Sequence, residues 1–190
     1  MRIVAGKFRG RTLVAPAHEG VRPTADRVRE SMFNILAHGI DGFELQGARV
    51  IDLFAGTGAL GLEAMSRGAA YCLFVEDNAD ARALIRDNIE AFGLTGETRI
   101  FRRDATDLGP ASAKDSYTLA FLDPPYGKGL GEKGLDILAS GRWLVPGAIC
   151  VLEERAGTAV TLPSAYDLLD TRTYGDTDVR FLRLRKTEGL

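Results

Sequence analysis

The chain has 190 residues, 45% of them hydrophobic and 26% charged, a length and composition typical of one globular domain. No apolar run is long enough to span a membrane and the first residues do not resemble a signal peptide, so we expect a cytoplasmic protein that does not bind membranes. A net charge of only −2 argues weakly against binding to nucleic acid by the chain as a whole.

The N-terminal segment is the basic part of the chain. Residues 2–15 alternate in polarity and contain Gly6 and Gly10, which predicts a short strand or hairpin. Residues 1–30 are net positive by four, whereas the remainder is net negative by six. A basic segment of this kind can bind a polyanion, although an ordinary solvated surface explains the charges equally well. The candidates for contacts with the phosphates of such a polyanion are Lys7, Arg9, Arg11, Arg22 and Arg27.

A helix is predicted to follow this segment. It begins at Arg22-Pro23-Thr24, with Thr24 as the expected N-cap, and Gly39 ends it. Apolar residues at helical spacing indicate the face that packs against the core, and the start of the helix could cover a cofactor. The apolar positions are Val28, Met32, Ile35 and Leu36, with Arg29 beside them.

From residue 49 onward, strands and helices alternate. Strands are expected over residues 50–55, 71–76, 98–103, 117–122 and 148–153, and helices over 59–67, 78–92 and around 135–138. Residues 105–116 contain Gly109 and Pro110, so any helix there must be short. Two alternating runs in residues 166–185 predict a closing hairpin around Gly175-Asp176. The alternation predicts an α/β fold with a doubly wound, mainly parallel sheet, to which the hairpin adds an antiparallel edge.

The cysteines and histidines indicate neither disulfides nor a metal site. Cys72 and Cys150 fall within apolar strand-like runs, so we expect buried, reduced thiols. His18 and His38 lack the spacing and the neighbouring ligands of a metal centre, and no structural metal is expected.

A glycine-rich loop joins the first strand of this alternating region to its helix. Gly56, Gly58 and Gly61 allow the backbone to pass closely beneath a ligand where the helix begins. Glu76 ends the second strand, twenty residues after Gly56, and a carboxylate there can accept both hydroxyls of a ribose. Together these features favour a site for an adenosine-type cofactor over a purely structural loop.

Two further carboxylates each have two interpretations. Asp52 could lie near the ammonium group of S-adenosylmethionine, or it could be a buried carboxylate that accepts hydrogen bonds from loop amides. Asp104 could bind the adenine amino group, or it could cap a helix. A nicotinamide dinucleotide also uses a glycine loop and an acidic second-strand end, but it needs the helix N-terminus for its pyrophosphate.

The tetrapeptide Asp-Pro-Pro-Tyr, residues 123–126, directly follows an apolar strand. Two prolines cannot continue a strand ladder, so the chain must leave the sheet along a stiff path. A carboxylate, a proline carbonyl and an aromatic ring are thereby placed at the carboxyl edge, where open α/β sheets bind ligands. A strand end followed by a simple turn is the alternative for the tetrapeptide taken alone.

The order and spacing of these motifs resemble class I S-adenosylmethionine-dependent methyltransferases that act on amino nitrogens. The matching residues are Asp52–Gly58, Glu76, Asp104 and Asp123–Tyr126. The N-terminal runs Arg2–Arg11 and Arg22–Glu30 resemble the RsmD family of 16S ribosomal RNA guanine-N2 methyltransferases, and the resemblance covers nearly the whole chain. Ala25 is a small departure, since many relatives have threonine there.

The resemblance implies a seven-stranded Rossmann-like sheet, with residues 1–40 as an RNA-contacting β/α extension and residues 41–190 as the methyltransferase domain. It implies methyl transfer from S-adenosylmethionine to the N2 amine of a guanine in 16S ribosomal RNA, on the small ribosomal subunit, and we expect a monomer. The catalytic candidates are Asp123, Pro124 and Tyr126. The cofactor-binding candidates are Asp52, Phe54, Gly56, Gly58, Glu76, Asp104 and Ala105.

Three other functions compete with this one. A DNA adenine-N6 methylase shares the tetrapeptide, but such enzymes usually carry an added target-recognition region for which this chain has little spare length. A non-catalytic RNA-binding module with a relict cofactor fold is disfavoured by the joint presence of the glycine loop, Glu76 and Asp123. A nicotinamide oxidoreductase would need a hydride-transfer acid, and none is evident.

Overall fold

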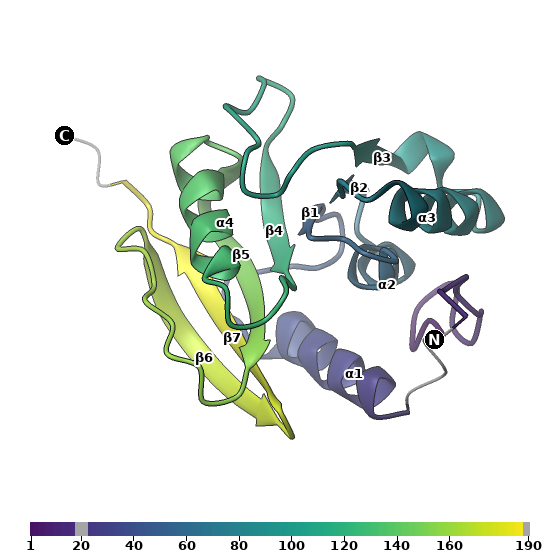
Figure 1. Ribbon diagram of the computed structural model, residues 1–190, viewed down its shortest axis with the longest axis horizontal. Helices are drawn as coiled ribbons and strands as arrows, with labels where there is room; N and C mark the ends of the chain where they lie inside the picture. Colours follow the sequence, from purple (N-terminus) through teal and green to yellow (C-terminus); the bar gives the residue numbers. More distant parts are fainter. Residues whose placement is uncertain (18–22, 188–190) are drawn as a thin grey trace.

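The computed structural model describes residues 1–17 and 23–187, which form one seven-stranded sheet with helices on both faces (Figure 1). The helices are α1 (Pro23–His38), α2 (Ala59–Ser66), α3 (Ala79–Ala91) and α4 (Leu130–Ser140), with a short 3-10 helix η1 (Thr95–Glu97). The strands are β1 (Arg49–Leu53), β2 (Tyr71–Val75), β3 (Thr98–Phe101), β4 (Tyr117–Leu122), β5 (Leu144–Arg155), β6 (Tyr166–Tyr174) and β7 (Thr177–Leu184).

The sheet has the strand order β3-β2-β1-β4-β5-β7-β6, and its first five strands are parallel. β7 pairs antiparallel with both β5 and β6, so the C-terminal hairpin closes one edge of the sheet. The chain order changes direction between β1 and β4, and open α/β sheets bind ligands at such a switch point. The predicted doubly wound sheet with an antiparallel hairpin is confirmed.

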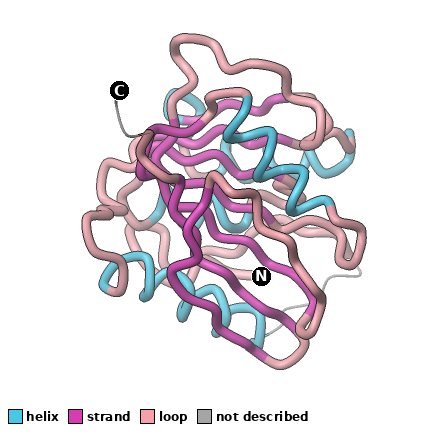
Figure 2. The backbone as a smooth tube through the Cα atoms, turned by 90° about the vertical axis from the view of Figure 1, so that its left-hand side faces the viewer, coloured by secondary structure: helices cyan, strands magenta, loops and turns pink. Residues whose placement is uncertain are grey.

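Two hydrophobic layers cover the sheet. Helices α1, α2 and α3 pack on one face, where Phe33, Phe74 and Phe121 are fully buried. Helix α4 and the loop before β4 cover the other face, around Leu135 and Trp143. Figure 2 views the sheet from the β6 side and shows its twist between these layers. Residues 1–40 contribute to the first layer, and their separation from residues 41–190 as a unit stays a prediction.

Most element boundaries follow from local signals. The Asn78 side chain accepts a hydrogen bond from the Ala81 N–H at 2.9 Å and so caps α3 as expected. β3 ends at residue 101, two residues earlier than predicted, because the Arg103 N–H turns back to the Phe101 carbonyl at 3.0 Å. Residues 105–116 contain no helix.

The N-terminus forms a minimal hairpin, one of the two structures predicted for it. Residues 2–15 contain a single antiparallel bridge between Arg2 and Thr12, with two tight turns between these residues. Gly6 and Gly10 have φ angles of 85° and 82°, and these left-handed turns bend the chain before a ladder can form. α1 begins at Pro23, before the expected cap Thr24, and proline is favoured in the first turn of a helix.

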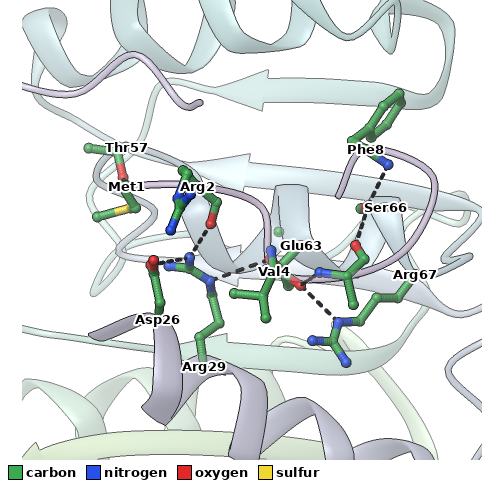
Figure 3. Close-up of polar contacts among 12 residues, drawn as sticks. Met1, Arg2, Val4, Phe8, Asp26, Arg29, Thr57, Glu63, Ser66 and Arg67 are labelled. Carbon is green, nitrogen blue, oxygen red and sulfur yellow. Dashed lines mark hydrogen bonds and ion pairs between the residues drawn. The ribbon is translucent and has the colours of Figure 1, made fainter. Parts of the chain in front are cut away.

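Buried charges attach the N-terminal segment to α2 (Figure 3). The fully buried Glu63 carboxylate accepts hydrogen bonds from the Val4 N–H at 2.9 Å and the Ala5 N–H at 3.0 Å. It also pairs with Arg67 at 2.9 Å and with Arg29 at 3.4 Å. Arg29 donates a further hydrogen bond to the Arg2 carbonyl, so α1, α2 and the segment are held together by one ion-pair network.

Cys72 and Cys150 are buried free thiols, as predicted, and they lie in the layers on opposite faces of the sheet. No helix in residues 1–17 or 23–187 is long and apolar enough to cross a membrane. Among these same residues, no group of three His, Cys, Asp or Glu side chains is arranged to hold a metal ion.

Candidate active site

The site lies where β1 and β4 end beside β5, which continues to Arg155. These neighbouring parallel strands are in register at Leu53, Leu122 and Leu152. The next residue of each strand is therefore placed in a row at the carboxyl edge of the sheet. The row consists of Phe54, Asp123 and Glu153, and all three line one pocket.

This pocket has a volume of about 1180 Å³. Its walls come from α1, the glycine loop, the start of α3, the Asp-Pro-Pro-Tyr segment and the turn between β6 and β7. The predicted site residues in its lining are Asp52, Phe54, Gly56, Asp123 and Tyr126. Motifs that are up to 74 residues apart in the sequence thus share one cavity.

The backbone of the glycine loop is held in left-handed conformations. Gly56 has a φ of 57° and Gly58 a φ of 78°, and the non-glycine Phe54 also has a positive φ of 61°. A Cβ on Gly56 would meet no atom within 4 Å, whereas a Cβ on Gly61 would lie 2.5 Å from the Phe74 ring. Gly56 therefore leaves room beside the backbone for a ligand, and Gly61 allows α2 to pack closely on β2. Strained residues such as Phe54 concentrate at functional sites.

Glu76 connects the glycine loop to the start of α3. One carboxylate oxygen accepts a hydrogen bond from the Gly56 N–H at 2.8 Å and the other accepts from the Asn78 N–H at 2.9 Å. A carboxylate has about four acceptor positions, so these two bonds leave capacity for hydroxyl groups. Glu76 does not line the pocket, and its contact with a ribose stays a prediction.

Asp52 is 1% exposed and accepts a hydrogen bond from the Gly61 N–H at 3.0 Å. The structure thus has the buried, amide-bonded carboxylate of the second interpretation, although the residue also lines the pocket. Burial raises the pKa of Asp52 well above its usual value, and the nearby Asp123 and Glu76 raise it further. A bound cation would favour the charged form of this group.

Besides Glu76, four predicted catalytic or cofactor-binding residues are absent from the pocket lining: Gly58, Asp104, Ala105 and Pro124. The exposed Asp104 accepts hydrogen bonds from the Thr106 N–H at 2.8 Å and the Thr106 hydroxyl at 2.7 Å, and these bonds lower its pKa. It therefore stabilises a turn after β3, which resembles the capping role left open for it. Contacts of these four residues with a cofactor or substrate stay predictions.

Asp123 and Glu153 form a carboxyl pair inside the pocket. The Asp123 side chain reaches solvent through the pocket, but the surrounding protein atoms and the repulsion of Glu154 raise its pKa to about 6. The Glu153 side chain lies within hydrogen-bonding reach of Asp123, which opposes this rise. Sequence reasoning missed Glu153, although a polar residue at the end of the apolar strand predicted over 148–153 is a signal that could have indicated it.

The turn between β6 and β7 supplies one wall beside Tyr126. The Tyr126 hydroxyl lies 3.3 Å from the Thr177 hydroxyl, and the Tyr174 hydroxyl lies 2.6 Å from that of Ser31 on α1. The hairpin tip is thereby held between α1 and the Asp-Pro-Pro-Tyr segment. Nothing in the local pattern of the hairpin indicates this role, because its contacts involve residues 51 and 143 positions away.

The basic candidates are distributed over two parts of the surface. Lys7, Arg9 and Arg11 are exposed on the N-terminal segment, and Arg27 is exposed on α1. Arg11 packs its guanidinium group 4.3 Å from the centre of the Phe92 ring on the α3 side. Arg22 lies outside the described residues. Met1 of the same N-terminal segment lines the pocket, so the basic segment reaches the pocket entrance.

Comparisons with known proteins identify the family. Residues 1–183 match the family model described as Conserved hypothetical protein 95. The chain is 35% identical over 191 residues to Ribosomal RNA small subunit methyltransferase D of Escherichia coli K12, covering 100% of this chain and 92% of that protein. The chain belongs to the RsmD family.

Other relatives agree with this assignment. The protein of the same name from Haemophilus influenzae is 32% identical over 182 residues, which cover 95% of this chain and 92% of that protein. A solved structure of a candidate methyltransferase, yhhF of Escherichia coli, superposes with a TM-score of 0.81 and 30% identity, covering 97% of this chain and 98% of that one. The fold is that of the class I methyltransferases.

Proposed function

We propose that this protein transfers a methyl group from S-adenosylmethionine to the exocyclic N2 amine of a guanine in 16S ribosomal RNA on the small ribosomal subunit. The observation that carries the proposal is the position of Asp123, which ends β4 and opens into a 1180 Å³ pocket shared with the glycine loop. The names of the curated relatives support ribosomal RNA of the small subunit as the substrate.

The pocket has features that suit S-adenosylmethionine. The open space beside Gly56 gives a ligand access to the loop backbone, and the acidic Asp52 and Asp123 favour a cationic ligand. Asp52, Phe54 and Gly56 would hold the cofactor on the α2 side, and Glu76 would accept its ribose hydroxyls. When bound, the cofactor supplies an electrophilic methyl group on a sulfonium centre.

The Asp-Pro-Pro-Tyr segment would bind and aim the target amine. The exocyclic amine of guanine is a poor nucleophile because its lone pair is delocalised into the ring. The Asp123 carboxylate and the Pro124 carbonyl would each accept one amine N–H, which favours a pyramidal nitrogen whose lone pair points at the methyl group. Tyr126 would stack on the base, a contact worth about 1–3 kcal/mol.

The experiment that tests this proposal offers the protein three substrates. Labelled S-adenosylmethionine is incubated with small ribosomal subunits, free ribosomal RNA and duplex DNA, and the labelled nucleotide is mapped. We expect label on the N2 amine of a single guanine of 16S RNA. Label found only in DNA adenine overturns the proposal in favour of a DNA methylase, and label on another RNA atom limits it to RNA methylation.

A variant of Asp123 separates chemistry from cofactor binding. Asp123→Ala should lower turnover by about 10²–10⁴-fold, because the amine loses an acceptor that aligns it in the transition state. The affinity for S-adenosylmethionine, measured by calorimetry, should fall much less. Turnover close to that of the unaltered protein contradicts a catalytic role for Asp123.

A further inference from the structure

Glu153 lines the pocket beside Asp123 and has no role in the proposed chemistry so far. We propose that Glu153 is a positioning residue, whose protonated carboxyl group donates a hydrogen bond to the Asp123 carboxylate and holds it charged and aimed at the amine. This inference rests on the proposed methyl transfer. It adds a residue that orients Asp123, the main catalytic group, and keeps it charged.

The backbone around the pair is rigid on both sides. β4 and β5 are in register up to Leu122 and Leu152, so Asp123 and Glu153 follow at equivalent positions on neighbouring strands. Glu153 is itself paired with Val179 of β7, which keeps β5 regular beyond the end of β4. Two prolines follow Asp123 and restrict the chain there. The separation of the two Cα atoms is therefore determined by the sheet rather than by a mobile loop.

The charges around the pair favour the retention of one proton. Most of the charged groups around the pair are carboxylates. The cation among them, Arg29, already forms ion pairs with Asp26 and Glu63. The titratable and charged groups that face the pair are Asp52 of β1, Arg29 of α1, Tyr126 after β4, Glu154 of β5 and Asp176 of the β6–β7 turn. Two adjacent carboxylates in such surroundings cannot both ionise without strong repulsion.

Glu153 is less exposed than Asp123, and burial together with the neighbouring Asp123 raises the pKa of Glu153 well above its usual value. The less exposed Glu153 is therefore the group that retains the proton. A hydrogen bond donated by this proton lowers the pKa of Asp123, against the opposing effects of burial and Glu154. Near neutral pH, Asp123 is then a charged acceptor with a fixed partner, while Glu153 is neutral. The two groups titrate as a coupled pair.

The pair also provides a destination for the proton released by the reaction. The amine nitrogen forms its new bond to the methyl carbon with its lone pair, and the electrons of the carbon–sulfur bond remain on sulfur. One N–H bond then breaks, its electrons stay on nitrogen, and the proton moves to the Asp123 carboxylate. Asp123 reaches solvent through the pocket and can pass this proton to water, which restores the charged acceptor.

Two variants of Glu153 distinguish a donor from a group that only fills space. Glu153→Gln keeps a hydrogen-bond donor of the same shape, and Glu153→Leu keeps a similar volume without a donor. For Glu153→Gln we expect a kcat within about threefold of the unaltered protein and an unchanged acid limb of the pH profile. For Glu153→Leu we expect the acid limb to move to higher pH and kcat at pH 7 to fall about tenfold or more.

Loss of packing alone would lower kcat equally at all pH values and would leave the acid limb in place. The inference is therefore overturned if Glu153→Leu shows no shift of that limb, or if Glu153→Gln loses as much activity as Glu153→Leu. Calorimetry with S-adenosylmethionine gives a second criterion, because replacing a neutral group by Gln leaves the charge unchanged. A loss of about tenfold or more in the cofactor affinity of Glu153→Gln would show an ionised Glu153 and overturn the inference.

A measurement without RNA separates this inference from the proposed function. Carbon-13 NMR titration of the Asp123 carboxyl group in the free protein should give the same pKa with Glu153 and with Glu153→Gln, and a higher one with Glu153→Leu. If this shift occurs but no RNA is methylated, the carboxyl pair stands and the proposed function fails. If RNA is methylated but the shift is absent, the positioning role fails.

Discussion

Asp123 lies in surroundings that suit its proposed role and lower the stability of the folded chain. Its pKa rises from 3.8 to about 6 because the surrounding protein desolvates it and Glu154 repels its charge. The folded state therefore binds more protons than the unfolded state between these two values. The stability that the folded state gains by binding this proton more tightly is fully present below pH 3.8 and is lost as the pH rises through about 6.

The variant Asp123→Asn should reverse this loss. The amide keeps an acceptor for Glu153 but carries no charge at any pH in the range. We expect a Tm close to that of the unaltered protein at pH 4 and higher by a few degrees at pH 7.5, measured by thermal unfolding at both pH values. A difference in Tm that is the same at both pH values would show that Asp123 has no raised pKa.

Tyr126 offers a second test at a single side chain. Tyr126→Phe keeps the ring and loses only the 3.3 Å contact with Thr177, so its kcat/KM for the RNA substrate should stay within a few fold. Tyr126→Ala should reduce kcat/KM by about 5- to 150-fold, the equivalent of a stacking energy of 1–3 kcal/mol. Equal losses in the two variants would assign the effect to the hydroxyl group and contradict stacking.

Among the secondary-structure elements, α2 depends on a close approach to β2. A Cβ added to Gly61 would lie 2.5 Å from the Phe74 ring and 2.6 Å from the Cys72 sulfur, both in the buried layer. We expect Gly61→Ala to lower the free energy of unfolding by about 1–3 kcal/mol, measured by chemical denaturation. Gly96→Ala is the matched control, because no atom lies within 4 Å of its added Cβ, and it should leave stability nearly unchanged.

The N-terminal segment depends on the buried charge of Glu63. Glu63→Ala leaves Arg67 without its ion-pair partner and Arg29 with Asp26 alone, and we expect a loss of about 3–5 kcal/mol in the free energy of unfolding. Hydrogen exchange should also become faster at the Val4 and Ala5 amides, which donate hydrogen bonds to Glu63. Glu97→Ala removes only an exposed pair with Lys7 at 3.9 Å and should cost less than about 1 kcal/mol.

For the molecule as a whole, the distribution of charge should determine how RNA binds. The double variant Lys7→Gln/Arg9→Gln removes two exposed charges from the basic segment. If each contacts a phosphate, the slope of log Kd against log salt should decrease by about 1.4, or 0.7 for each contact. Arg172→Gln/Arg185→Gln removes the same charge from the β6–β7 hairpin and should leave the slope unchanged. Equal slopes for both double variants would exclude the N-terminal segment from the interface.

The strands and helices of the α/β region were predictable because their signals are local. Apolar runs of strand length, the Asn78 cap and the glycines that follow helices each act within a few residues, and β4 has the predicted bounds. The same holds for the Asp-Pro-Pro-Tyr tetrapeptide, since two prolines after an apolar strand force the chain out of the sheet. Composition and motif spacing were therefore sufficient to indicate the fold class and the position of Asp123.

Other parts of the site depend on contacts between distant residues. The pairing of Glu153 with Asp123 results from the register of β4 and β5, and the hairpin tip reaches the pocket through Tyr126 and α1. The N-terminal turns are attached to α2 because the Glu63 carboxylate accepts hydrogen bonds from the Val4 and Ala5 N–H groups. The amino-acid sequence alone determined which chemical groups stand at the strand ends. Strand order and register decided which of them meet, because pairing between strands depends on packing over the whole sheet.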